Sequence, residues 1–152
     1  MSAISFFVPC VPPKTTAQQK GAFSAGGRIR FFTKKKVAQA EGDYISLFMR
    51  HAPADPMEGP LRLRVCLTWP WRKSEKKGVV ARGWAPMTSK PDFDNASKML
   101  CDVMTKLRFW TDDSQIADGR IAKGWGDRPG VYVEVAPFAE EGWMRRDSPA
   151  GN

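Results

Sequence analysis

Two aspartates stand one residue apart in the segment SKPDFDNASK, residues 89–98 of a chain with a formal net charge of +8. Carboxylates this close repel each other unless a cation lies between them. Asp92 and Asp94 therefore suit a magnesium site, because Mg²⁺ takes oxygen ligands, keeps several waters and binds substrate phosphates. Such a site can orient an attacking water or stabilise the leaving oxygen of a phosphodiester, with one metal ion or two. Taken alone, the residues Asp-Phe-Asp-Asn favour a plainer interpretation, a capped helix start with ordinary surface acids.

The backbone around these acids is constrained by Pro91, which biases Lys90 towards an extended conformation. If the chain stays extended through Asp94, the side chains of Asp92 and Asp94 point to the same side. Asp94 is then well placed as the N-cap of the following helix, with Asn95 as the other candidate. Negative charge is tolerated there because the helix macrodipole is positive at its N-terminus.

A helix is predicted over residues 95–108, and its polar face carries further candidate residues. Lys98 and Asp102 follow Asp94 at intervals of four residues, so all three lie on one face. The apolar stripe on the opposite face consists of Met99, Leu100, Val103 and Leu107. Lys98 could hold an empty acidic site together or balance the charge of a phosphate.

A second acidic pair, Asp112 and Asp113, follows where the chain reverses after this helix. The next strand runs back past the helix and could bring one of the two beside Asp92 and Asp94. Adjacent side chains of an extended segment face opposite ways, so only one of the pair can enter a given site. The spacing does not show which of them does.

The remaining elements indicate one domain of strands and two main helices. Strands are predicted over 4–8, 28–32, 61–69, 115–123 and 131–135, the second of them in a hairpin, and another helix over 36–50. Residues 61–69 alternate most clearly, and the isoleucines of 115–123 need a bulge near Gly119 to share one face. Residues 12–27 and 71–91 are predicted to be loops.

Composition narrows the class of protein. The 24 Lys and Arg residues exceed the 16 Asp and Glu residues, which favours a polyanionic partner, nucleic acid first and an anionic membrane second. There is no apolar run long enough to cross a bilayer and no signal-peptide pattern, so we expect a cytoplasmic protein. The three cysteines are widely spaced and form no CxxC pair, and the chain has a single histidine. The sequence therefore argues against a zinc site and against a Ser/His catalytic triad.

The predicted loop 71–91 concentrates positive charge. It contains six cations, Arg72, Lys73, Lys76, Lys77, Arg82 and Lys90. With its one acid, Glu75, the net charge of the loop is +5. Trp71 and Trp84 are interleaved with them, a mixture that suits phosphate contact and base stacking, although a solvated insertion is the alternative. Lys14, Lys20, Arg28 and Arg30, nearer the N-terminus, are further candidates for DNA contact.

Taken together, these residues resemble the signature of the RusA family of Holliday junction resolvases, small endodeoxyribonucleases often carried by phages. The resemblance rests on Asp92-Phe-Asp94-Asn95, Lys98, Asp102 and the run Asp112-Asp113-Ser-Gln-Ile116. The segments 7–14 and 126–135 resemble the opening and closing segments of the family. We accordingly expect a RusA-like domain over residues 1–136 and a C-terminal tail over 137–152.

The resemblance implies a small α+β domain, with a mixed or antiparallel sheet and about two main helices, that forms a two-fold homodimer. It implies symmetric paired cleavage of four-way DNA with Mg²⁺, for which Mn²⁺ can substitute, and no membrane partner. The essential acids of the family fall on Asp92, Asp94 and Asp113 and its essential lysine on Lys98. Asn95, Asp102 and Asp112 are then neighbours of the site.

Three other functions stay open at this point. One is a phosphatase of the haloacid dehalogenase type, whose Asp-x-Asp motif normally ends a buried strand, unlike residues 85–91 here. The others are a nuclease for flaps or other branched DNA, and a DNA-binding module whose acids are structural. Many RusA relatives carry several arginines where residues 14–20 read KTTAQQK, so the selectivity for junctions is the least constrained expectation.

Overall fold

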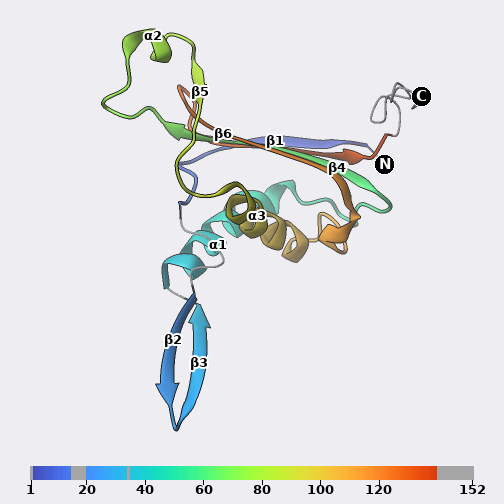
Figure 1. The fold of residues 1–152 in the computed structure, drawn as a ribbon. Coiled ribbons are helices and arrows are strands. Elements are labelled where there is room, and N and C mark those ends of the chain that lie inside the picture. Colours follow the sequence, from blue (N-terminus) through green and yellow to red (C-terminus); the bar gives the residue numbers. More distant parts are fainter. Residues whose placement is uncertain (1, 15–19, 34, 140–152) are drawn as a thin grey trace, which may run out of the picture.

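The computed structural model describes residues 2–14, 20–33 and 35–139. They form a five-stranded mixed sheet in the order β1-β7-β4-β6-β5, with helices α1 and α3 packed on one face, and a separate hairpin β2-β3 (Figure 1). The elements are β1 Ile4–Pro9, β2 Lys20–Ala25, β3 Arg28–Thr33, α1 Lys35–Phe48, η1 Met49–His51, β4 Leu61–Pro70, α2 Lys77–Val80, β5 Trp84–Pro86, α3 Phe93–Lys106, η2 Asp113–Gln115, β6 Ile116–Gly126 and β7 Gly130–Pro137. The expected α+β class with a mixed sheet and two main helices is confirmed.

Strand β4 lies at the centre of the sheet, and its alternating apolar residues need cover from a helix layer on one face. Leu61, Leu63, Val65, Leu67 and Trp69 are all buried, as the pattern predicts. They join one core cluster with the apolar stripe of α3 and with residues of α1. The core therefore lies between the sheet and the two helices, and the residues of β4 between these five face away from it.

Strand β6 runs parallel to β4, with α3 in the connection between them. The pairing shifts between Leu61, opposite Ile116, and Arg62, opposite Asp118, so the extra residue is Ala117. The expected bulge is thus present, but two residues before Gly119. Beyond it, Ile121, Lys123 and Trp125 share the face that packs on the helices, because each is paired with an inward-facing residue of β4.

Both predicted loops contain regular structure that their composition does not indicate. Strand β2 pairs with β3 in a hairpin that projects from the body beside α1 (Figure 1). The basic segment contains α2 and the edge strand β5, which pairs antiparallel with the end of β6. Strand β5 is three residues long and forms only through tertiary pairing, so local pattern could not reveal it.

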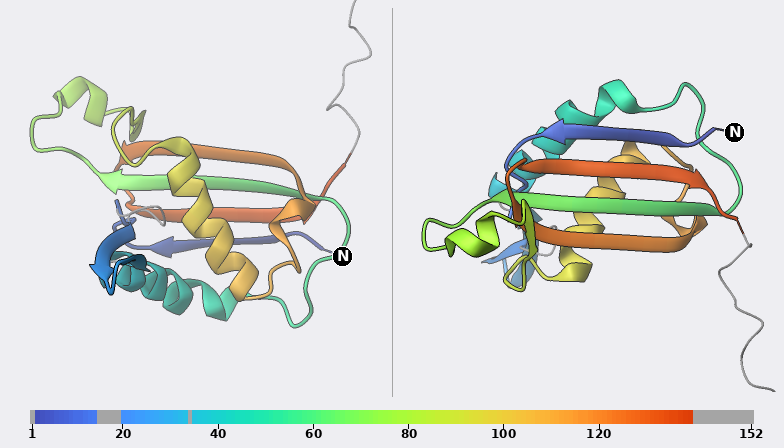
Figure 2. Two further views of the ribbon diagram at one scale, coloured as in Figure 1. Left: turned by 60° about the horizontal axis from the view of Figure 1, so that its bottom comes forward. Right: turned by 90° about the horizontal axis from the view of Figure 1, so that it is seen from above.

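Helix α3 crosses the sheet diagonally. Its first turn lies towards the end of the molecule that carries α2, and its last turn leads to η2 (Figure 2). After β7 the chain continues to Phe138, whose backbone N–H donates to the carbonyl of Pro60 at 2.8 Å. Residues 140–152 of the predicted tail lie outside the described part. In the described part, no helix is long and apolar enough to span a membrane.

Candidate active site

The first acidic pair sits at the start of α3. Asp92 is the N-cap residue, with extended backbone angles of φ −64° and ψ 154°, and its side chain makes no capping hydrogen bond. Asp94 lies in the first turn of the helix, not at the N-cap, so that prediction is wrong by two residues. The extended backbone ends at Asp92, which removes the basis for placing both side chains on the same side. Both carboxylates are exposed beside the positive end of the helix macrodipole.

The segment that delivers Asp92 is held by a lysine that sequence reasoning missed. The ammonium of Lys123 donates to the backbone carbonyls of Ser89 at 2.8 Å and Pro91 at 2.5 Å. Lys123 comes from β6 and lies on the sheet face that packs against the helices, opposite Leu67. An inward-facing lysine between Ile121 and Trp125 breaks the alternation of a half-buried strand, and this was the available signal.

A second group of candidates surrounds the middle of α3. Lys98 and Asp102 form an ion pair at 3.6 Å on one exposed face of the helix. Burial raises the pKa of the neighbouring Cys101 thiol to about 11, with Asp113 and then Asp102 adding to the rise. Asp113, Asp102 and Lys98 are thus near enough to Cys101 to act on its thiol electrostatically. Along the helix axis Lys98 lies about 6 Å and Asp102 about 12 Å beyond Asp94, so this group begins one turn further on.

The turn that carries Asp113 is fixed by Asp112 and Gln115. The Asp112 carboxylate accepts a hydrogen bond from the backbone N–H of Ser114 at 2.8 Å. Hydrogen bonding from the Ser114 side chain, and then from its backbone, lowers the Asp112 pKa. The Gln115 side chain accepts from the N–H groups of Thr111 and Asp112 and completes a capping box. Asp112 is thus engaged in building the turn, although both Asp112 and Asp113 are exposed.

Gln115 also ties this turn to a distant loop, a role that sequence reasoning did not assign. Its amide nitrogen donates to the carbonyls of Met57 at 3.0 Å and Gly59 at 3.1 Å. The spacing Asp-x-x-Gln is itself a capping-box pattern, so the local part of this role was readable from the sequence. The link to residues 57–59 depends on tertiary packing.

The carboxylate oxygens of Asp92, Asp94 and Asp113 are ligands that suit a hard divalent ion, and all three side chains are exposed. In the part of the chain that the structure describes, no three His, Cys, Asp or Glu side chains lie close enough together to hold a metal ion. Among the described residues, the structure therefore does not gather Asp92, Asp94 and Asp113 into one metal-binding cluster. The assignment of these three as metal ligands stays a prediction.

Asn95 faces the interior. Its side-chain oxygen is buried and has no hydrogen-bond partner among the described residues. It borders a cavity of about 10 Å³ together with Tyr44 and Leu67, a volume that fits a single water molecule. The Asn95 side-chain oxygen is therefore shielded from solvent, whereas the nearby acids Asp92 and Asp94 are exposed.

Two of the predicted DNA-contacting residues meet at Trp125. The Lys14 ammonium and the Arg72 guanidinium both lie over the ring of Trp125, at 5.3 and 5.0 Å from its centroid, so the opening segment and the basic segment meet there. Arg72 also pairs with Glu75 at 2.7 Å. The side chains of Arg28, Lys73, Lys76, Lys77, Arg82 and Lys90 are exposed. Those of Lys20 and Arg30 lie outside the described residues.

Comparison with known proteins identifies the family of this chain. Residues 11–136 match the family model described as Endodeoxyribonuclease RusA. The chain is 36% identical over 123 residues to the crossover junction endodeoxyribonuclease rusA of Lactococcus phage r1t, covering 80% of this chain and 88% of that protein. It is 32% identical over 98 residues to the uncharacterized protein YqaN of Bacillus subtilis (strain 168), covering 60% of this chain and 68% of that protein. The chain therefore belongs to the RusA family of endodeoxyribonucleases.

Proposed function

We propose that this protein is a Holliday junction resolvase, an endodeoxyribonuclease that cuts four-way DNA by paired, symmetric hydrolysis of phosphodiesters. The observation that carries the proposal is the family match over residues 11–136, which spans both acidic groups, Lys98 and the basic segment. The similarity to a phage crossover junction endodeoxyribonuclease supports the same substrate class. A phosphatase motif would end a buried strand, whereas Asp92 follows an exposed segment, 88–90, and a buried proline.

The proposed cofactor is Mg²⁺, with Mn²⁺ as a substitute, held by Asp92, Asp94 and Asp113. When bound, such an ion orients the attacking water and stabilises the charge that develops on the phosphodiester oxygens. Mg²⁺ needs only one or two protein carboxylates when phosphate oxygens and waters complete its shell. Exposed acids that are not yet clustered are compatible with a site completed by the substrate.

The chain's own residues then have separate tasks. Lys98 lies on the exposed face of α3, where its ammonium can exchange the Asp102 carboxylate for a phosphate oxygen. Lys123 and Gln115 position the two segments that carry Asp92 and Asp113. The cations around Trp125 and along the basic segment would hold the DNA backbone, so binding should weaken steeply with salt.

The proposed assembly is a two-fold homodimer that works in the cytoplasm of a bacterial or phage-infected cell. Resolution of a four-way junction needs two opposed cuts, and a two-fold dimer supplies two equivalent sites. Static light scattering of the purified chain, alone and with a synthetic junction, tests this directly. A monomer in both conditions would contradict paired cutting by one assembly.

The experiment that tests the function compares a synthetic four-way junction, a flap and a linear duplex of matched sequence. Each is incubated with the purified protein and Mg²⁺, and in parallel with a chelator. We expect symmetric nicks in the junction that need the metal ion. Preferential cutting of the flap would favour a nuclease for other branched DNA. Binding without cutting of any substrate would favour a DNA-binding module.

A further inference from the structure

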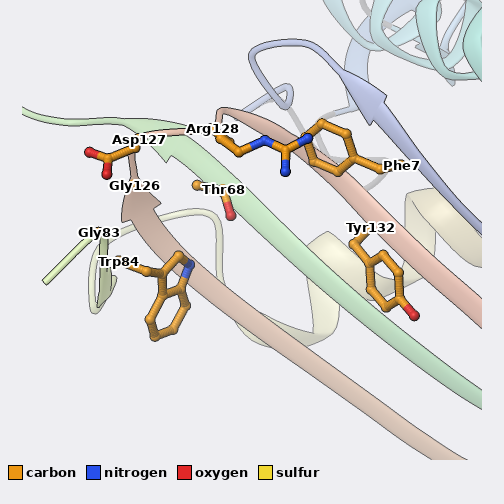
Figure 3. A pocket seen from close by; sticks show the side chains of 8 residues that line it. All are labelled: Phe7, Thr68, Gly83, Trp84, Gly126, Asp127, Arg128 and Tyr132. Carbon is orange, nitrogen blue, oxygen red and sulfur yellow. The ribbon is translucent and has the colours of Figure 1, made fainter.

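The sheet face opposite the helices carries a pocket that the proposed chemistry does not use. It has a volume of about 400 Å³ and opens over β4 and β6 near the ends of these strands (Figure 3). Trp84 borders it on one side, Phe7 and Tyr132 on the other, and Thr68 lies between them. Trp84 and Tyr132 are 36% and 38% exposed, and they line one pocket with Phe7; contiguous exposed apolar surface of this kind marks a binding site.

Two glycines allow aromatic rings to lie directly on the backbone here. A Cβ atom on Gly124 would lie 2.1 Å from the indole of Trp84, and one on Gly130 would lie 2.4 Å from the ring of Phe7. Both glycines are paired in register with Thr68, one from each neighbouring strand. Since strands are about 4.8 Å apart, the two rings lie over strands about 10 Å apart with Thr68 between them. We call Phe7, Trp84 and Tyr132 the aromatic platform.

Polar groups at the rim favour the edge of a base over a phosphate. The Asp127 carboxylate accepts from the indole N–H of Trp71 at 2.7 Å, and the Tyr132 hydroxyl donates to Glu134 at 3.2 Å. These carboxylates repel a phosphate but accept hydrogen bonds from the amino and imino groups of nucleobases. The guanidinium of Arg128 lies over the Phe7 ring, 5.1 Å from its centroid, and adds a flat cationic surface.

The surroundings of the pocket are suited to the backbone of the same strand. The basic segment leads directly into β5, and exposed Arg82 lies two residues before Trp84. Figure 1 shows the α2 region projecting beside β5 at this end of the sheet. Of the two tryptophans of this segment, Trp71 is engaged with Asp127, so Trp84 offers the exposed ring. Stacking surfaces next to cations are the usual design for binding unpaired nucleic acid.

We propose that the aromatic platform binds an unpaired or unstacked nucleobase of the branched DNA, stacked on Trp84. The proposal rests on the proposed function, because a branch point is where such bases occur. Removing a base from the stack costs least when it is already unpaired. The platform would thereby contribute selectivity for branched over linear DNA, at a site separate from the acids of α3.

The test uses a branched DNA with one unpaired 2-aminopurine at the branch, the full chain, and a chelator to prevent cleavage. With the wild-type protein we expect quenching of the 2-aminopurine fluorescence on binding. Trp84→Ala should abolish the quenching and weaken binding of this DNA roughly tenfold, while binding of paired duplex changes less than about twofold. Trp84→Phe keeps a flat ring and should retain most of the quenching.

Two further variants separate the platform from general damage. Gly124→Ala keeps the indole in the chain but displaces it from the backbone, so it should also lose the quenching. Met49→Ala truncates a residue that is 61% exposed elsewhere and should behave as wild type. Quenching and affinity unchanged in both Trp84→Ala and Gly124→Ala would overturn the proposal.

Two other outcomes are informative. If Trp84→Ala converts a dimer to a monomer in light scattering, the face is a subunit interface and the base-binding assignment is wrong. If wild-type protein cuts no DNA with Mg²⁺ yet quenches in a Trp84-dependent way, the proposed nuclease function fails while the platform stands. If the protein cleaves the junction normally but its quenching does not depend on Trp84, the nuclease function stands and the base-binding proposal fails.

Discussion

The contact of Lys123 with the segment before Asp92 leads to a quantitative prediction for Lys123→Met. Methionine keeps an unbranched apolar stem between β6 and α3 but removes the ammonium that binds the carbonyls of Ser89 and Pro91. The substitution therefore leaves the packing between β6 and α3 nearly intact and removes the hydrogen bonds that hold residues 89–91 in place. Asp92 follows Pro91 directly, so any shift of this carbonyl moves the first candidate ligand.

The size of the effect follows from the two hydrogen bonds. A hydrogen bond to a charged group contributes about 1.5–3 kcal/mol when it is shielded from water. The bond to Pro91 is partly buried, whereas the bond to Ser89 is exposed, so only the first should count nearly in full. We expect a loss of about 2 kcal/mol, which shifts the urea midpoint by roughly 1 M for a domain of this size. A displacement of Asp92 by about 1 Å would slow cleavage roughly 100-fold.

Urea unfolding and single-turnover cleavage of a four-way junction at saturating protein measure these two quantities. Lys36→Met is the matched control, because it removes the same charge from an exposed position on α1. Both variants should bind the junction with similar affinity, since each loses one positive charge. Wild-type cleavage by Lys123→Met, together with the expected loss of stability, would refute the idea that this anchor positions Asp92.

Other expectations follow from the acids and from the turn of η2. Asp113→Asn should abolish cleavage and retain junction binding, and near wild-type cutting would remove Asp113 from the site. Because Asp113 raises the pKa of Cys101, the same change should lower that pKa from about 11 and speed alkylation of Cys101 at pH 9 severalfold, as followed by peptide mass spectrometry. Asp92→Asn should leave this rate unchanged; an equal acceleration would contradict the separation of the two acidic groups. Gln115→Ala should cost about 2 kcal/mol, as several partly exposed hydrogen bonds are lost, and exposed Gln39→Ala less than about 0.5 kcal/mol in urea unfolding. A larger loss for Gln39→Ala than for Gln115→Ala would refute this account of the turn.

The regular elements with a clear period could be predicted from sequence. The alternation of residues 61–69 and the helical stripe of Met99, Leu100 and Val103 both reflect burial on one face, a local pattern that survives in the fold. Strand β3, the last strand and the need for a bulge were likewise readable. Strands β2 and β5 and the placement of the bulge at Ala117 were not, because pairing with another strand decides them.

The start of α3 shows how a local rule can be misapplied. Asp is a favoured residue both at the N-cap and in the first turn, so the sequence alone did not distinguish Asp92 from Asp94. The backbone enters the helix at Phe93, which separates two acids that an extended chain would align.

By itself, the sequence determined the residue types of the site and the family, because the spacing of Asp92, Asp94, Lys98 and Asp113 is a covalent property of the chain. The tertiary structure decided which groups meet. It placed Asp113 near Cys101, fixed Asp112 in a turn, and brought Lys123 under the segment that carries Asp92. These contacts join residues far apart in the chain through the packing of a sheet against helices, and no local pattern encodes that packing.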